Sequence, residues 1–152
     1  MPMGRIRKAC LAVAGVAALA VVPSAALATP GSGVSGTILA RGTSEDGLKI
    51  KTKGRTDVVV RTITIEPGGA TGWHYHQGEL IAVVRSGTLA RTMADCSVET
   101  STAGQSFVER DGADHVHIGR NLGTEPVVLY VTYLLPEGAP LSADAPDPGC
   151  DQ

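Results

Sequence analysis

From residue 36 onward, apolar and polar positions alternate in short segments that are separated by turn residues. Alternation with a period of two is typical of β-strands that bury one face. The segment from Asp57 to Ile65 is the clearest case, because it is rich in Val, Ile and Thr and is followed by Pro67, which cannot continue a central strand. The other predicted strands are 36–41, 48–52, 80–84, 88–93, 97–100, 106–109, 115–119 and 127–135.

No segment repeats its apolar residues with the 3.6-residue period of a helix. About eight to ten short strands at close intervals predict an all-β fold, an antiparallel sandwich or barrel. We expect a single domain over residues 36–136, followed at 137–152 by a surface tail rich in Pro, Ala, Gly and Asp.

The first 28 residues have the organisation of a secretory signal peptide. Arg5, Arg7 and Lys8 precede an apolar run, and an Ala-Leu-Ala tripeptide ends at Ala28. The run has about 14 apolar residues, fewer than the roughly 20 that a membrane-spanning helix needs. We therefore expect a secreted, extracellular protein, with residues 29–35 as a linker and no membrane contact after signal removal.

Removal of this segment takes away three of the 13 basic residues and none of the 15 acidic ones, so the remaining charge is 10 − 15 = −5. An acidic domain without a basic stripe argues against nucleic acid or an anionic membrane surface as a partner.

Two cysteines, Cys96 and Cys150, follow the predicted cleavage site. An even number of cysteines in a secreted chain predicts a disulfide, which would tie the tail to the barrel. The alternative is a pair of free thiols or a thiolate metal site.

All four histidines fall in two His-x-His pairs, His74 with His76 and His115 with His117. Residues two apart on a strand point to the same face, about 7 Å apart, so each pair presents two imidazoles on one side. Neutral imidazole is the commonest metal ligand in proteins. The pairs favour a metal site over the alternative, in which the histidines are structural residues without a metal.

The residues around the first pair resemble the first motif of the cupin superfamily, in the order Gly68, His74, His76, Glu79, Gly87. Its second motif is similar to the later segment that contains Gly104, His117 and Asn121. The resemblance spans roughly residues 36–136. It implies a cupin-type antiparallel jelly-roll β-barrel in which two histidines, a glutamate and a later histidine bind one divalent metal.

The carboxylate of the first motif has two assignments. Glu79 comes one residue closer to His76 than the family spacing, whereas counting back from Gly87 places Leu80 at the ligand position. A bulge at Gly78 would reset the alternation and turn Glu79 inward.

The third histidine also has two assignments. Counting from Gly104 places His115 at the ligand position, and counting from Asn121 places His117 there. We prefer His117 and keep His115 as the alternative.

The predicted site therefore contains His74, His76 and His117, with Glu79 or His115 as further ligands. Imidazoles with at most one carboxylate suit Zn, Mn, Fe, Ni or Cu, and the sequence does not select among these metals. No catalytic residue besides the ligands is identified.

Two functions follow from this site: a metal-dependent small-molecule enzyme, such as a dioxygenase or isomerase, or a non-catalytic module that binds a small ligand, such as a sugar, or the metal itself. A deep pocket with an ionisable neighbour would favour the enzyme, and a narrow apolar barrel would favour the binding module. The resemblance also implies that two copies pair through their sheets as a homodimer.

Overall fold

The computed structural model describes residues 33–150. The predicted signal peptide and residues 29–32 of the linker lie outside this range, so the structure does not test them. Within the described residues there is no helix that could span a membrane. The unit that carries the predicted barrel begins at Gly36.

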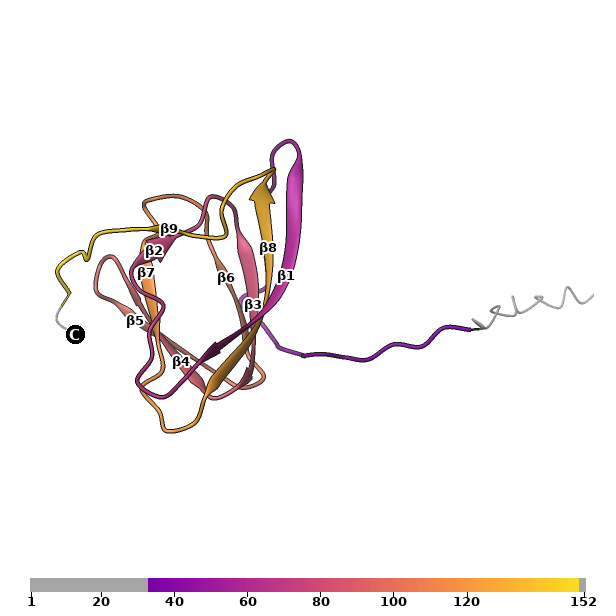
Figure 1. Cartoon of the computed structure of the whole chain (residues 1–152), viewed down its shortest axis with the longest axis horizontal. Coiled ribbons are helices and arrows are strands. Elements are labelled where there is room, and N and C mark those ends of the chain that lie inside the picture. Colours follow the sequence, from indigo (N-terminus) through magenta and orange to yellow (C-terminus); the bar gives the residue numbers. More distant parts are fainter. Residues whose placement is uncertain (1–32, 151–152) are drawn as a thin grey trace, which may run out of the picture. The chain divides into compact units, whose positions relative to one another are not determined.

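This unit is all-β and has two antiparallel sheets (Figure 1). The first sheet has the order β1-β8-β3-β6 and contains β1 (Thr56–Ile65), β8 (Val127–Pro136), β3 (Leu80–Ser86) and β6 (Ser106–Glu109). The second has the order β5-β4-β7-β2-β9 and contains β5 (Val98–Thr102), β4 (Thr88–Met93), β7 (His117–Arg120), β2 (His74–Tyr75) and β9 (Ala143–Asp144). Neighbours within a sheet are mostly distant in sequence, which is the arrangement of a jelly roll.

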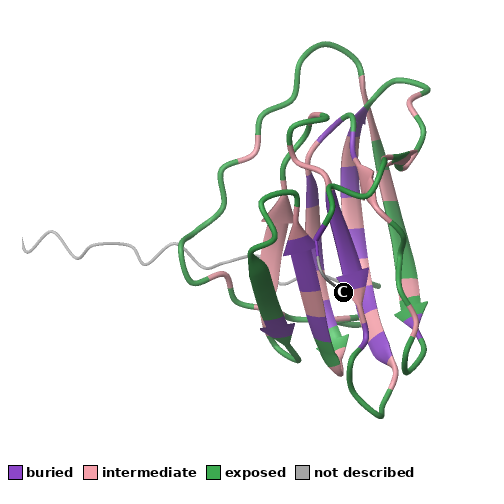
Figure 2. Ribbon diagram, turned by 90° about the vertical axis from the view of Figure 1, so that its left-hand side faces the viewer, coloured by how far each residue is buried: buried purple, intermediate pink, exposed green. Residues whose placement is uncertain are grey.

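The core lies between the inner faces of the two sheets. In β8 every second residue is buried, from Val127 to Leu135, and the residues between them are only partly covered. Strand β3 follows the same pattern with Leu80, Ala82 and Val84 inward. This is the inward register that counting back from Gly87 predicts. Figure 2 shows this alternation of buried and intermediate residues along the strands.

Glu79 continues the regular β3–β8 ladder, because the Leu134 N–H donates to the Glu79 carbonyl at 2.9 Å. Gly78 makes this approach possible: a Cβ at this position would overlap the Leu134 carbonyl and lie 2.9 Å from the Leu135 Cα. The bulge considered for Gly78 is therefore absent. Strict alternation then sends Leu80 inward and Glu79 outward.

The strands predicted at 36–41 and 48–52 are not formed. The chain there pairs with the sheets only through a bridge between Thr43 and Gln105, and Ile38, Leu39 and Leu48 are exposed. Their alternation is loose, and β6, the neighbouring edge strand, offers this segment only that short contact.

The predicted disulfide between Cys96 and Cys150 is present, with a Cα–Cα distance of 5.4 Å. Cys96 lies in the turn between β4 and β5, and Cys150 lies at the end of the tail. In a chain-entropy estimate, closing a loop of this length stabilises the fold by about 4 kcal/mol at most.

Candidate metal centre

Three histidines meet on the inner face of the second sheet. His74 of β2 lies directly opposite His117 of β7 in the ladder, and their ring centroids are 4.5 Å apart. Directly opposed residues in an antiparallel pair have close Cβ atoms on one face, so this contact follows from the strand register. His76 follows two residues later and is almost completely buried, with its ring 4.9 Å from that of His74.

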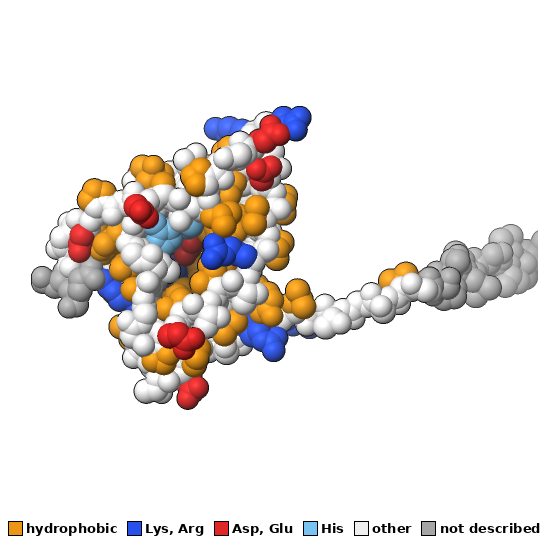
Figure 3. All heavy atoms as spheres, in the orientation of Figure 1, with side chains coloured by type: hydrophobic (Ala, Val, Ile, Leu, Met, Phe, Trp, Pro, Cys, Tyr) orange, Lys and Arg blue, Asp and Glu red, His pale blue; other side chains and the backbone are white. Residues whose placement is uncertain are grey.

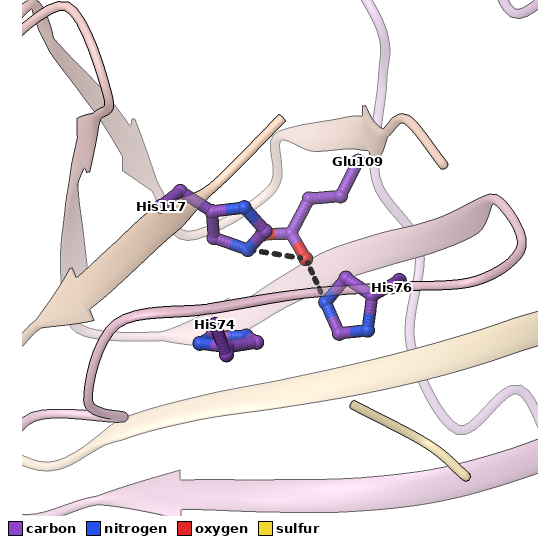
Figure 4. A group of neighbouring side chains, drawn as sticks. All are labelled: His74, His76, Glu109 and His117. Carbon is purple, nitrogen blue, oxygen red and sulfur yellow. Dashed lines mark hydrogen bonds and ion pairs between the residues drawn. The ribbon is translucent and has the colours of Figure 1, made fainter. Parts of the chain in front are cut away.

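A carboxylate from the first sheet completes the group. Glu109, at the end of β6, places Oε2 3.1 Å from His76 Nε2 and 3.2 Å from His117 Nε2 (Figure 4). One ligand atom from each of His74, His76, Glu109 and His117 lies within 4.8 Å of the others. We call these four residues the His/Glu cluster.

The side-chain direction of Glu109 is a consequence of sheet register. Glu109 pairs with Leu80, and Phe107 pairs with Ala82, so all four side chains share the inner face. The sequence does contain this signal, since Phe107 and Glu109 are two apart on a short strand and an aromatic residue favours the buried face. Our sequence reasoning missed it because glutamate is rarely buried without a partner.

A backbone carbonyl group fixes the orientation of each of the three imidazoles. Nδ1 lies 2.9 Å from the Gly72 carbonyl in His74, 2.7 Å from Leu141 in His76 and 2.9 Å from His115 in His117. A carbonyl oxygen only accepts, so each Nδ1 carries the hydrogen and each neutral ring has its lone pair on Nε2. Such outer hydrogen bonds are the usual support of metal-binding histidines.

Glu109 is charged in this setting. Burial alone would raise the pKa of its carboxyl group, but the close approach of His117 and His76 and the nearby Arg91 charge outweigh burial and lower that pKa well below its usual value. Arg91 is itself buried, 3.6 Å from Glu109 Oε1, with its guanidinium 3.7 Å from the Phe107 ring centroid. Arg91 also forms an ion pair with Glu99 at 2.5 Å, and the Glu99 side chain is exposed at the surface.

His117 and His74 differ in the direction in which their pKa values are shifted. Burial lowers the pKa of His117, but its contact with Glu109 outweighs burial and raises that pKa above 6.5. Burial lowers the pKa of His74 below 6.5, and the neighbouring His117 and His76 lower it further. Without a metal, His117 next to Glu109 therefore binds a proton more readily than His74 does.

The donor set fits a metal ion. Although His117 Nε2 is 3.2 Å from Glu109, this buried atom makes no hydrogen bond of acceptable geometry. Lone pairs on two imidazole nitrogens face an ionised oxygen at about the same distance, an arrangement that requires a proton or a cation between them. Three nitrogen donors and one carboxylate are a common ligand set for divalent transition metals.

Two of the predicted ligands, Glu79 and His115, do not belong to the His/Glu cluster. The Glu79 carboxylate accepts a hydrogen bond from the Lys51 backbone at 3.0 Å, because its strand position points outward. The His115 side chain is 41% exposed and 3.8 Å from Asp114, since His115 lies in the turn before β7. His115 contributes to the site only through its carbonyl group, which accepts from His117.

The cluster lines a small cavity of about 50 Å³. Most other lining side chains are apolar, and the polar exceptions are Thr71 and Tyr133. Tyr133 is 3% exposed, and its ring centroid is 5.8 Å from that of His76. Histidine side chains are visible in a hollow on the face that Figure 3 shows, so the site lies close to solvent on that side.

Comparison with known families and structures agrees with this architecture. The family model for the cupin domain matches residues 61–133, which contain all four residues of the cluster. An uncharacterized conserved protein with a double-stranded β-helix domain from Klebsiella pneumoniae is 26% identical, with a TM-score of 0.50 over 62% of this chain and 75% of that one. The chain belongs to the cupin superfamily.

Other cupin-like structures are more distant in sequence. The DMSP lyase DddQ from Ruegeria pomeroyi is 16% identical, with a TM-score of 0.51 over 60% of this chain and 45% of that one. The polyketide cyclase RemF from Streptomyces resistomycificus is 18% identical, with a TM-score of 0.50 over 62% and 67%. These likenesses concern the fold alone. A search of curated proteins found no match.

The position of the carboxylate distinguishes this cupin from the motif that its sequence resembles. Counting back from Gly87 assigns the motif's glutamate to Leu80, and Glu109 is the direct ladder partner of Leu80. The two positions are neighbours on the inner face, because opposed residues in an antiparallel pair have Cβ atoms about 5 Å apart. The acid therefore reaches the histidines from the adjacent strand.

We predict that His117 titrates above pH 6.5 and His74 below it in the metal-free protein, as followed by NMR of the ring nitrogens. Glu109→Gln should lower the pKa of His117, because the charge that opposes burial is lost. Equal or reversed pKa values for the two rings would contradict the proposed electrostatics.

The shifted pKa values of His117 and Glu109 predict how the stability of the protein depends on pH. The raised pKa of His117 gives a contribution that is complete below pH 6.5 and is lost as pH rises through its folded value. The lowered pKa of Glu109 gives one that is present above pH 4.5 and is lost as pH falls. In chemical denaturation, Glu109→Gln should therefore lower the free energy of unfolding most between pH 4.5 and pH 6.5. A loss of unfolding free energy that does not depend on pH would refute the linkage.

Proposed function

We propose that this cupin binds one divalent transition-metal ion through His74, His76, Glu109 and His117. The observation that carries the proposal is that all three imidazoles have Nδ1 on a backbone carbonyl, which leaves Nε2 free, and that one ligand atom of each ring and of Glu109 lies within 4.8 Å of the others. Zn, Mn, Fe, Ni and Cu all accept such donors, and the donor set does not choose among them.

The size of the cavity limits what else the site can hold. A volume of about 50 Å³ is far below the roughly 300–1,000 Å³ of pockets for drug-sized ligands. We therefore propose a binding module for the metal together with water or another very small oxygen-containing ligand. Glu109 would neutralise one of the two metal charges.

Catalysis on a small molecule is the second candidate, and Tyr133 is the observation in its favour. Burial raises the pKa of this phenol, so it stays protonated at neutral pH and can donate a hydrogen bond to a ligand in the cavity. A bound metal would supply a Lewis acid to such a ligand. The fold alone does not choose between the two candidates, because cupin-like structures include proteins named as enzymes.

The second candidate requires a coordination position that the protein does not fill. Protein loaded with Mn²⁺ should then accelerate the relaxation of water protons, because an exchanging water occupies that position. Relaxation no faster than expected for a fully enclosed ion would exclude catalysis at the metal.

The metal-binding proposal predicts about one ion per chain in protein purified without a histidine tag, as measured by elemental analysis. His74→Ala, His76→Ala, His117→Ala and Glu109→Gln should each lower metal affinity strongly, because each change removes a direct donor. Titration calorimetry with a single metal would compare the variants.

Matched controls come from the two predicted ligands that lie outside the cluster. Glu79→Gln and His115→Ala should bind the metal as the unaltered protein does, since the carboxylate of Glu79 points outward and the His115 carbonyl survives substitution. Unaltered binding in all four donor variants would show that the cluster is purely structural.

We also propose that the protein is exported and cleaved after Ala28. The disulfide supports this, because such bonds persist in oxidising compartments. N-terminal sequencing of the protein recovered from the culture medium should begin at Thr29. Recovery with Met1 intact, or retention of the protein in the reduced cell interior, would contradict export.

A further inference from the structure

The segment at 137–150, predicted as a surface tail, crosses from one sheet to the other. It leaves the end of β8, passes to β2 in the second sheet and continues beyond β9 toward Cys150 (Figure 1). We call residues 137–150 the strap. Ala139 and Leu141 pack against the hydrophobic core, so the strap is in contact with the interior of the domain.

The strap supplies one of the three carbonyl groups that orient the histidines. His74 and His117 use carbonyls two residues away in their own segments, Gly72 and His115. His76 instead uses Leu141, which is 65 residues away in sequence, at the shortest of the three distances, 2.7 Å. The tautomer of His76 therefore depends on the position of the strap.

Backbone pairing with the second sheet also attaches the strap beyond this point. Strand β9 pairs with only two residues of β2, and the Ala145 N–H donates to the Trp73 carbonyl at 2.9 Å. Prolines at 140, 146 and 148 cannot donate. The covalent anchor is the disulfide, which fixes Cys150 to the turn after β4, the strand that pairs with β7 and its His117.

We propose that the strap positions His76 for metal binding and that the Cys96–Cys150 disulfide maintains this position. This rests on the metal-binding function proposed above. If the strap detaches, the buried Nδ1–H of His76 loses its acceptor, and the ring can move its hydrogen to Nε2, where no lone pair then faces the metal. Loss of such outer partners typically costs about 10- to 100-fold in metal affinity.

Two variants weaken the strap without altering a donor. The double change Cys96→Ser and Cys150→Ser removes the anchor, and Ala145→Pro removes the N–H that bonds to Trp73 while the disulfide remains. Calorimetric titration with Zn²⁺ should show affinity lowered by about 10- to 100-fold in the double variant, and by a smaller factor in Ala145→Pro.

A second measurement needs no metal. NMR of the ring nitrogens at alkaline pH, where all imidazoles are neutral, should show His76 with its hydrogen on Nδ1 in the unaltered protein. In both variants His76 should gain the Nε2–H form, whereas His74 and His117 should keep their tautomers because their acceptors lie outside the strap. A loss of stability alone would not select one histidine of the three.

Val127→Ala is the control for stability, because Val127 is fully buried in β8 but does not line the cavity. This variant should be less stable and yet retain both Zn²⁺ affinity and the His76 tautomer. Equal loss of affinity in Val127→Ala would overturn the proposal, since the effect would then follow stability.

The remaining outcomes also decide the question. If the double variant keeps unaltered Zn²⁺ affinity and the Nδ1–H form of His76, the strap does not position this ring. If the double variant does not fold, Ala145→Pro alone decides by the same two measurements. If the unaltered protein binds no metal, the proposed function fails, while the tautomer measurement still establishes whether the strap holds His76.

Discussion

The carboxylate of Glu109, held between two buried imidazoles, is the interaction on which the interior of this cupin depends. Glu109 comes from β6 of the first sheet, His117 comes from β7 of the second sheet and His76 directly follows β2 of that sheet, so the contact links the two layers. A buried charge is costly unless it is paired. Here the charge is balanced by the histidine proton and by Arg91, or by a metal ion in place of the proton.

The surroundings of this interaction restrict its chemistry. Three imidazoles have their hydrogens committed to carbonyl groups, so the nitrogen atoms that face Glu109 are available to an ion. Apolar side chains from both sheets surround the small cavity inside the barrel that the cluster lines. The cluster therefore has the donors to hold a metal ion.

Glu109 lies directly opposite Leu80, the position at which counting back from Gly87 places the glutamate of the motif. Leu80 and Glu109 are opposed in one ladder, so an acid at either position reaches the same interior point. A linear motif follows one strand and cannot record an exchange between neighbouring strands. The strap is a similar case, because Leu141 and His76 meet across 65 residues.

Local pattern was enough to predict the all-β fold, the inward register of Leu80, the pairing of Cys96 with Cys150 and the approach of His74, His76 and His117. Period-two alternation and same-face spacing are properties of a single strand, so they can be recognised in the sequence without knowing which strands are its neighbours. Segments 36–41 and 48–52 show the limit of this reasoning, since a loose alternation does not form a strand without a partner edge. The contact between Glu109 and the histidines of the other sheet, the turn that carries His115, the path of the strap and the small volume of the cavity depend on tertiary structure. Each depends on which strands pair and how closely the two sheets pack, and these relations join residues that are far apart in the chain.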